Sequence, residues 1–100
     1  MTVPVRVTLE AREDIFRGKR YFDRKRYELG DEFIDEVLGL LDRIGESPRL
    51  YGEVGFGARA AGLKRFGYVA YYRIDQQGIE ILAVLHGARS ADIWKERASR

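Results

Sequence analysis

The chain has 100 residues, of which 45% are hydrophobic and 34% charged, and its formal net charge is +2. This length predicts a single domain over residues 1–100 that buries about two thirds of its unfolded surface, and the apolar share excludes a disordered tail. The absence of cysteine excludes disulfides and thiolate metal sites, and a single histidine without a carboxylate cluster argues against zinc. With no apolar signal core and no membrane-spanning run, we expect a soluble cytoplasmic protein with no cofactor.

The small net charge conceals segregated charges. Residues 17–26 hold six cations and one acid, residues 28–46 hold seven acids and one cation, and residues 54–74 hold four cations and no acid. A charged partner would therefore meet distinct faces. The alternative for the first two runs is internal, because helix-dipole matching and solvated ion pairs account for them without any partner.

A strand and a helix are predicted first. Apolar residues alternate over residues 3–9 (VPVRVTL), which favours a short strand with one buried face. Thr8 is a suitable N-cap for a following helix, and Gly30 is predicted to end it. The apolar residues of that helix recur at helical spacing, at Ala11, Ile15, Gly18 and Phe22.

A second helix is predicted to begin at an Asp31 N-cap and to end at Ser47-Pro48. Its expected buried face consists of Ile34, Val37, Leu38, Leu41 and Ile44, widened by Phe33 and Leu40. Because so few residues join the two helices, they must pack as an antiparallel hairpin, with the basic end of the first beside the acidic start of the second.

Three strands are predicted after a glycine-rich segment at residues 51–57. That segment lacks a following lysine-serine pair and a surrounding βαβ unit, so it fits a flexible connection better than a phosphate-binding loop. The strands are expected at Arg59 to about Lys64, at Tyr68 to Asp75 and at Ile79 to His86. The last of these is almost entirely apolar, which favours an inner position in the sheet.

A short helix is predicted over residues 91–98, with Ser90 as its cap and with Ile93 and Trp94 docking on the body of the domain. The fold class is therefore α+β. We expect a small, mostly antiparallel sheet in the order β-α-α-β-β-β, with the helical hairpin on one face and a short C-terminal helix.

Alternation along the strands assigns side chains to the two faces of the sheet. In the last strand Ile79, Ile81, Ala83 and Leu85 are expected opposite Glu80, Leu82, Val84 and His86. Arg73 falls on the alternate set of its own strand. We therefore expect cations and the histidine to converge on the sheet face away from the hairpin.

The segment GLKRFGYVAYYRI, residues 62–74, mixes cations with phenols. Tyr68 and Tyr72 fit core walls better than stacking platforms, and His86 fits a hydrogen-bonding role at a strand end better than a proton shuttle. Lys64 and Arg65 have no acid near them in the sequence, so they are the least suited to a plain solvated surface.

The sequence LKRFGYVAYYRI, followed by IEILAVLHGARSADIWKER, resembles the RelE/ParE superfamily of toxins from bacterial toxin–antitoxin modules. The opening TLEAREDI resembles the first strand and helix start of that family, and LGDEFIDEVLGLLDRIGESPRLYG resembles its second helix. The resemblance implies a small antiparallel-rich sheet with a helical hairpin. It also implies a growth-arresting toxin that is neutralised by a cognate antitoxin protein.

The resemblance leaves the target open. RelE-like members cut mRNA on the ribosome without metal, and for that branch the matching catalytic residues are His86, Arg89 and Arg65. ParE-like members inhibit DNA gyrase and need no such chemistry. For either branch, the residues that match phosphate- or target-binding cations are Arg59, Lys64, Arg65 and Arg73.

Two departures from the nuclease pattern favour the ParE-like branch. No tyrosine follows Tyr72, and Phe66-Gly67-Tyr68 stands where Phe-Pro-Tyr is familiar. The alternatives are the RelE-like endoribonuclease and a degenerate member that retains only antitoxin binding.

Overall fold

The computed structural model describes residues 2–89 and 91–100, apart from the side chain of Arg89. The predicted cap residue Ser90 lies outside the described residues. In chain order the elements are β1 (Val5–Val7), α1 (Leu9–Lys25), α2 (Leu29–Glu46), β2 (Glu53–Gly55), β3 (Ala58–Gly62), β4 (Tyr68–Asp75), β5 (Gly78–His86), the 3₁₀ turn η1 (Gly87–Arg89) and α3 (Ala91–Ala98).

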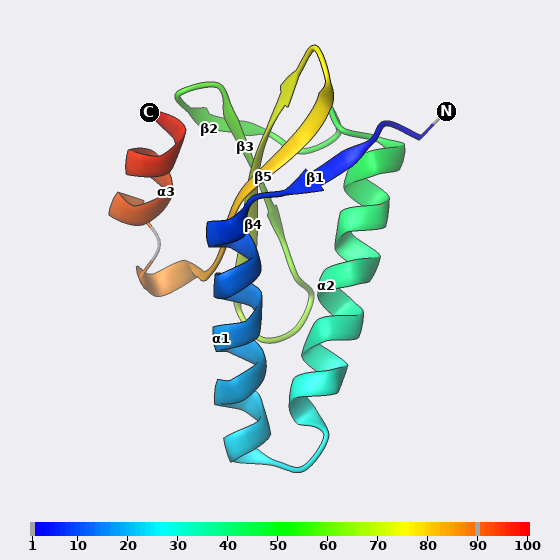
Figure 1. Cartoon of the computed structure of the whole chain (residues 1–100), viewed down its shortest axis with the longest axis vertical. Coiled ribbons are helices and arrows are strands. Elements are labelled where there is room, and N and C mark those ends of the chain that lie inside the picture. The colour runs from blue at the N-terminus through cyan, green and yellow to red at the C-terminus, as the bar shows by residue number, and fades with distance from the viewer. Residues whose placement is uncertain (1, 90) are drawn as a thin grey trace.

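The strands form one sheet in the order β1-β5-β4-β3-β2, with β1 parallel to β5 and the other neighbours antiparallel (Figure 1). The predicted α+β class is confirmed, and β5 is an inner strand as predicted. The glycine-rich segment is not merely a connection, because it contains β2. A two-residue turn, Phe56-Gly57, leads from β2 into β3, and both residues have positive φ angles of 55° and 74°.

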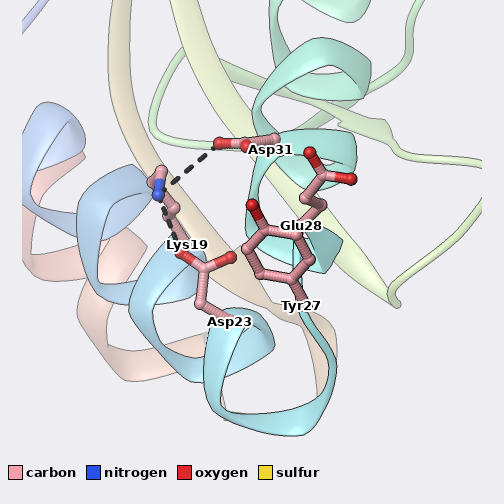
Figure 2. A pocket seen from close by; sticks show the side chains of 5 residues that line it. All are labelled: Lys19, Asp23, Tyr27, Glu28 and Asp31. Atoms are coloured by element: carbon pink, nitrogen blue, oxygen red, sulfur yellow. Dashed lines mark hydrogen bonds and ion pairs between the residues drawn. The ribbon is translucent and has the colours of Figure 1, made fainter.

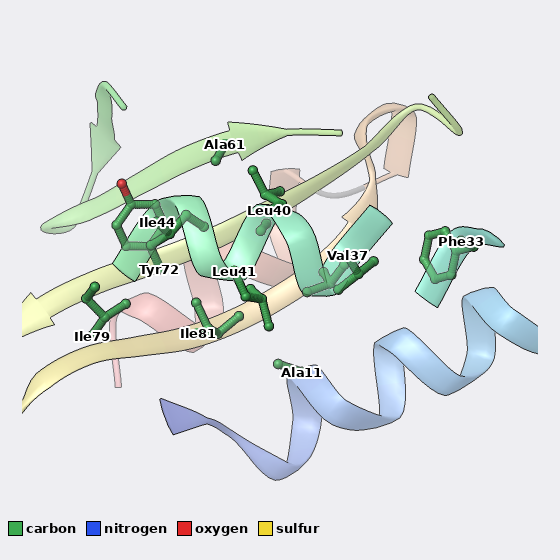
Figure 3. Packing of buried hydrophobic residues seen from close by; sticks show 12 residues of the cluster. Ala11, Phe33, Val37, Leu40, Leu41, Ile44, Ala61, Tyr72, Ile79 and Ile81 are labelled. Atoms are coloured by element: carbon green, nitrogen blue, oxygen red, sulfur yellow. The ribbon is translucent and has the colours of Figure 1, made fainter. Parts of the chain in front are cut away.

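The helical hairpin packs on one face of the sheet and forms the larger core (Figure 3). The side chains buried there are Ala11, Phe33, Val37, Leu40, Leu41, Ile44, Ala61, Ala70, Tyr72, Ile79, Ile81 and Val84. The predicted face of α2 is wrong for Leu38, which is 54% exposed, whereas Phe33 and Leu40 are fully enclosed. The helix is thus rotated so that Leu38 faces outward, and the Phe33 ring packs against both Phe22 of α1 and Tyr68 of the sheet.

The turn between α1 and α2 differs from prediction. The Thr8 hydroxyl caps α1 by accepting from the Ala11 N–H at 3.1 Å, as predicted, but the helix ends at Lys25 and α2 begins at Leu29. Gly30 therefore lies inside α2 and ends no helix, and Asp31 is not the N-cap. The capping function comes instead from α1, because the carboxylate of Asp23 accepts from the Gly30 N–H at 2.8 Å.

The second face of the sheet is covered by α3. Trp94 is 6% exposed and stacks on Tyr71 of β4, with ring centroids 5.1 Å apart, which confirms its predicted packing role. Ile93 stays 41% exposed, so its predicted docking is wrong. The smaller core on this face consists of Ala58, Tyr71, Leu82, Ala83, Trp94 and Ala98.

A β-bulge in β5 reverses the predicted sidedness of the second half of that strand, whereas Ile79 and Ile81 share one face as predicted. Tyr71 pairs with Ala83 and Tyr72 pairs with Ile81, so Leu82 is an extra residue between them. After the bulge, Val84 joins Ile79 and Ile81 under the hairpin, and Ala83 turns to the α3 side. Strict alternation predicts the opposite, because it allows no inserted residue.

Candidate functional site

The predicted cations do not converge on one face. Arg73 lies on the α3 side, where its Nε donates to Glu80 at 3.0 Å and its Nη1 to the Ala98 carbonyl at 3.1 Å. Arg59 pairs in register with the core residue Tyr72, and its Nη1 donates to the Tyr51 carbonyl at 2.6 Å. Both guanidiniums therefore hold backbone segments in place, and the expectation that they gather with His86 is wrong.

Arg65 is bound to the acidic helix. Its backbone N–H donates to Glu36 at 2.8 Å, and both terminal nitrogens of its guanidinium lie 3.2 Å from the carboxylate of Glu32. These bonds from Arg65, with a second contribution from Arg26, hold the pKa of the Glu32 carboxyl below its ordinary value. Lys64 next to it is exposed, and within the described part of the chain no hydrogen bond or ion pair engages its ammonium.

The turn that carries these cations is strained and anchored. Phe66 has a φ of 74°, which is unusual for a bulky residue, and Gly67 follows at 71°. The Phe66 ring packs edge-on against Phe22 and Phe33, with centroids 4.6 and 5.4 Å away, and this burial offsets the backbone strain. Tyr68 joins the same aromatic cluster. The turn at residues 64–67 is therefore fixed to the helices rather than free.

His86 lies beside this turn. The Ala88 N–H donates to its Nδ1 at 3.3 Å, so the neutral ring carries its proton on Nε2. A Cβ at Gly67 would lie 3.0 Å from that Nε2, and its φ of 71° is one that residues with a side chain rarely adopt, so this position favours glycine. The imidazole also meets the Tyr68 ring at 5.6 Å. The structure thus brings His86 together with the 64–67 turn at one end of the sheet, and separates both from Arg73.

Arg89 follows His86 within η1, so its backbone is close to the same end of the sheet. Its side chain lies outside the described part of the structure, and its predicted role stays a prediction. Near His86 the described contacts are therefore with a peptide N–H, a phenol ring and a glycine. This environment matches the hydrogen-bonding interpretation of the histidine.

A buried ion pair was not predicted. The Asp14 side chain is only 1% exposed and accepts from both terminal nitrogens of Arg97 in α3, at 2.6 and 3.2 Å. It also accepts from the Val84 N–H at 3.0 Å, and Arg97 donates to the Leu82 carbonyl at 3.1 Å. The pair thus satisfies backbone groups that flank the bulge. One signal existed, since Asp14 is three residues after Ala11 on the apolar stripe of its helix.

A shallow pocket of about 280 Å³ lies at the turn of the hairpin (Figure 2). Lys19 spans it, with its ammonium 2.7 Å from Asp23 and 3.6 Å from Asp31. The bond to Lys19 lowers the pKa of the Asp23 carboxyl and raises that of the lysine. Tyr27 and Glu28 complete the lining. Because the Lys19 ammonium already bonds both carboxylates, the residues of this pocket hold the two helices together.

Metal ligands do not gather elsewhere among the described residues, where no group of three or more histidine, aspartate or glutamate side chains is arranged to hold an ion. In the same residues no helix combines the length and the apolar character needed to cross a bilayer.

Comparison with known proteins places the chain in a family. Residues 5–91 match the family model described as the ParE toxin of the type II toxin–antitoxin system parDE. A chain from the structure of the chromosomal ParDE toxin–antitoxin system of P. aeruginosa has a similar fold, with a TM-score of 0.69 at 15% identity over 85% of this chain and 96% of that one. None of the curated proteins compared with the chain matches it significantly. Because the family model spans most of the chain, this protein belongs to the ParE toxin family of type II toxin–antitoxin systems.

Proposed function

We propose that the protein is a toxin that arrests growth by inhibiting DNA gyrase and that a cognate antitoxin neutralises it. The observation that carries the choice of target is the internal engagement of the arginines, because Arg59, Arg65 and Arg73 are each bonded to groups of the protein itself.

Metal-free RNA cleavage needs a base, an acid and cations that converge on one phosphate. Arg73 is on the other side of the sheet from His86, and Arg59 holds the loop before β2. A gyrase inhibitor needs only a surface that is complementary to gyrase. Lys64 suits such a surface, because it is exposed on a turn that is anchored to the helices. We assign Lys64 to target contact, and Arg59, Arg65 and Arg73 to holding the fold.

The antitoxin follows from the family and is supported by the similar fold found in a ParDE system. Antitoxins of such modules wrap the toxin with a segment that folds on binding. Such a segment needs apolar anchor points, and Val54 and Phe56 on the edge strand β2 and its turn are 45% and 61% exposed.

The test is a pair of assays on the purified chain. Supercoiling by DNA gyrase and cleavage of mRNA on stalled ribosomes are measured in parallel at equal protein concentrations. We expect dose-dependent loss of supercoiling and intact mRNA. Unaffected supercoiling together with defined mRNA cuts would overturn the proposal.

The second candidate is the RelE-like endoribonuclease, which is favoured by the position of His86 beside the 64–67 turn. It predicts that His86→Ala and Arg65→Ala each abolish toxicity while circular dichroism shows a retained fold. If neither assay shows activity and expression does not arrest growth, a member that only binds an antitoxin is the correct description.

A further inference from the structure

The outward face of α1 carries arginines without partners around an exposed ring. Phe16 is 49% exposed, and three exposed arginines lie four or eight residues from it. They are Arg12, Arg20 and Arg24, with Glu13 as the exposed acid among them. Within residues 2–89 and 91–100 none of the three arginines forms an ion pair or hydrogen bond, although Arg17 and Lys19 do. Arg20 and Arg24 are like charges four residues apart, which repel, so this part of the face is unfavourable in the isolated molecule.

The outward face of α2 has the opposite charge. Leu38 is 54% exposed on it, and the surrounding exposed acids are Asp31, Asp35, Asp42 and Glu46, with Arg43 as the exposed cation. Of these acids only Asp31 has a partner among the described side chains, the ammonium of Lys19 at 3.6 Å. The hairpin therefore presents a basic half with a central ring and an acidic half with a central leucine.

The two halves lie side by side and run in opposite directions (Figure 1). The contact between Lys19 and Asp31 fixes which residues lie level with each other. Because the helices are antiparallel, Arg12, seven residues before Lys19 on α1, is level with Leu38, seven residues after Asp31 on α2. Arg20 lies one residue nearer the hairpin turn than the level of Asp31. Arg12 lies between the levels of Asp35 and Asp42.

We infer that this face binds a second copy of the same chain. A two-fold axis parallel to the helices, in the plane of contact, places each α1 over the α2 of the other copy at the same level. Arg12 then faces Asp35 and Asp42 of the partner subunit, and Phe16 lies near its Leu38. A two-fold axis perpendicular to the helices would place arginines on arginines. Charge thus selects the first arrangement.

The size of the face predicts how stable the dimer is. Helices of 17 and 18 residues are about 26 Å long, and two side by side are about 20 Å wide, which gives roughly 500 Å² for each subunit. This is at the small end for specific complexes. The dimer is therefore weak, reversible and sensitive to salt, because charge pairs supply much of its attraction.

The test exchanges charges between the two helices. One variant carries Arg12→Glu, and the other carries Asp35→Arg and Asp42→Arg; all three positions are exposed. Each variant alone places like charges opposite each other. Mixed in equal amounts, they restore both α1–α2 contacts of the two-fold arrangement. Sedimentation velocity of the full chain measures the association at low salt and in about 1 M salt. At the higher concentration, charges more than about 3 Å apart are screened.

We expect the unmodified chain to dimerise at low salt, each variant to associate at least about tenfold more weakly, and the mixture to recover a heterodimer. Arg49→Glu is the matched control, since it makes the same charge change as Arg12→Glu at an exposed position outside the two helices and should leave the dimer intact. A monomer at every concentration, dimers that persist in both variants, a control that dissociates equally, or a mixture that stays monomeric would each overturn the inference.

Circular dichroism confirms that the variants are folded, and Leu38→Lys is a second variant expected to dissociate the dimer. Gyrase inhibition is measured separately and does not enter this result.

Discussion

Asp14 and Arg97 are 83 residues apart in the chain, yet their side chains form a two-pronged ion pair at 2.6 and 3.2 Å that joins α1 to α3. The same two groups satisfy the Val84 N–H and the Leu82 carbonyl beside the β5 bulge. One pair of side chains therefore fixes both the C-terminal helix and the irregular strand under it.

Replacing Asp14 with alanine is expected to lower the free energy of unfolding by about 3–5 kcal/mol, because it leaves a largely buried guanidinium and the Val84 N–H without their acceptor. Urea denaturation followed by circular dichroism measures this. Arg100→Ala is the matched control, since Arg100 pairs with Glu10 and Glu96 at the exposed end of the chain and its loss should change stability by less than about 1 kcal/mol. Equal effects of the two substitutions would contradict the assignment.

Two glycines of α2 are expected to respond in opposite directions to alanine. A Cβ at Gly30 would lie 2.4 Å from the Asp23 carboxylate and 2.5 Å from the Lys19 carbonyl, so Gly30→Ala should destabilise the fold by about 1–3 kcal/mol. At Gly39 the nearest atom is an Arg43 guanidinium nitrogen at 3.5 Å, and alanine there should stabilise by about 0.5–1 kcal/mol. Thermal melting of both variants checks the signs, and a stabilising Gly30→Ala would show that the hairpin turn is looser than described.

Substituting Arg65 with glutamine is expected to raise the pKa of Glu32 toward its ordinary value, because the Arg65 bond is the main cause of its lowering. Arg26→Gln should raise it less. A carboxyl whose pKa is lowered by folding contributes stability that is present above its unfolded pKa of about 4.3 and is lost as the pH falls through the folded value. Acid unfolding of the Arg65→Gln variant should therefore show less pH dependence in this window. An NMR titration of the Glu32 carboxyl carbon measures the pKa directly, and an unchanged value would exclude the role given to Arg65.

Lys64 and Arg59 are expected to separate target binding from folding. Lys64→Glu alters an exposed ammonium and should change stability by less than about 0.5 kcal/mol while it weakens gyrase inhibition. Arg59→Met removes charged hydrogen bonds to the Tyr51 and Arg49 carbonyls and should lower stability by about 1.5–3 kcal/mol. Inhibition measured well below the melting temperature, beside the denaturation midpoints, distinguishes the two effects. Inhibition unchanged by Lys64→Glu would remove that residue from the target surface.

Local patterns determined much of the architecture. The Thr8 cap, the end of α2 at Ser47, the whole of β4 and the span of α3 follow from spacing and turn residues within a few positions of each other. Such features depend on nearest neighbours along the chain, and these are visible in the sequence. The family resemblance could be recognised for the same reason, because its motifs keep their order and spacing.

Tertiary structure alone decided where the candidate site residues point. The bulge at Leu82 moves every later residue in β5, including His86, to the opposite face of the sheet. No local sequence pattern predicts the inserted residue. The role of Gly30 depends on its contact with Asp23, and the role of Asp14 depends on its ion pair with Arg97. Neither contact is visible in the sequence. Contacts between distant segments depend on the packed fold, whereas periodicity reports only which side of one element is apolar. For this reason the sequence determined the helices, the strands other than β2, and the family, and the fold decided that the predicted cations are separated and largely bound within the protein.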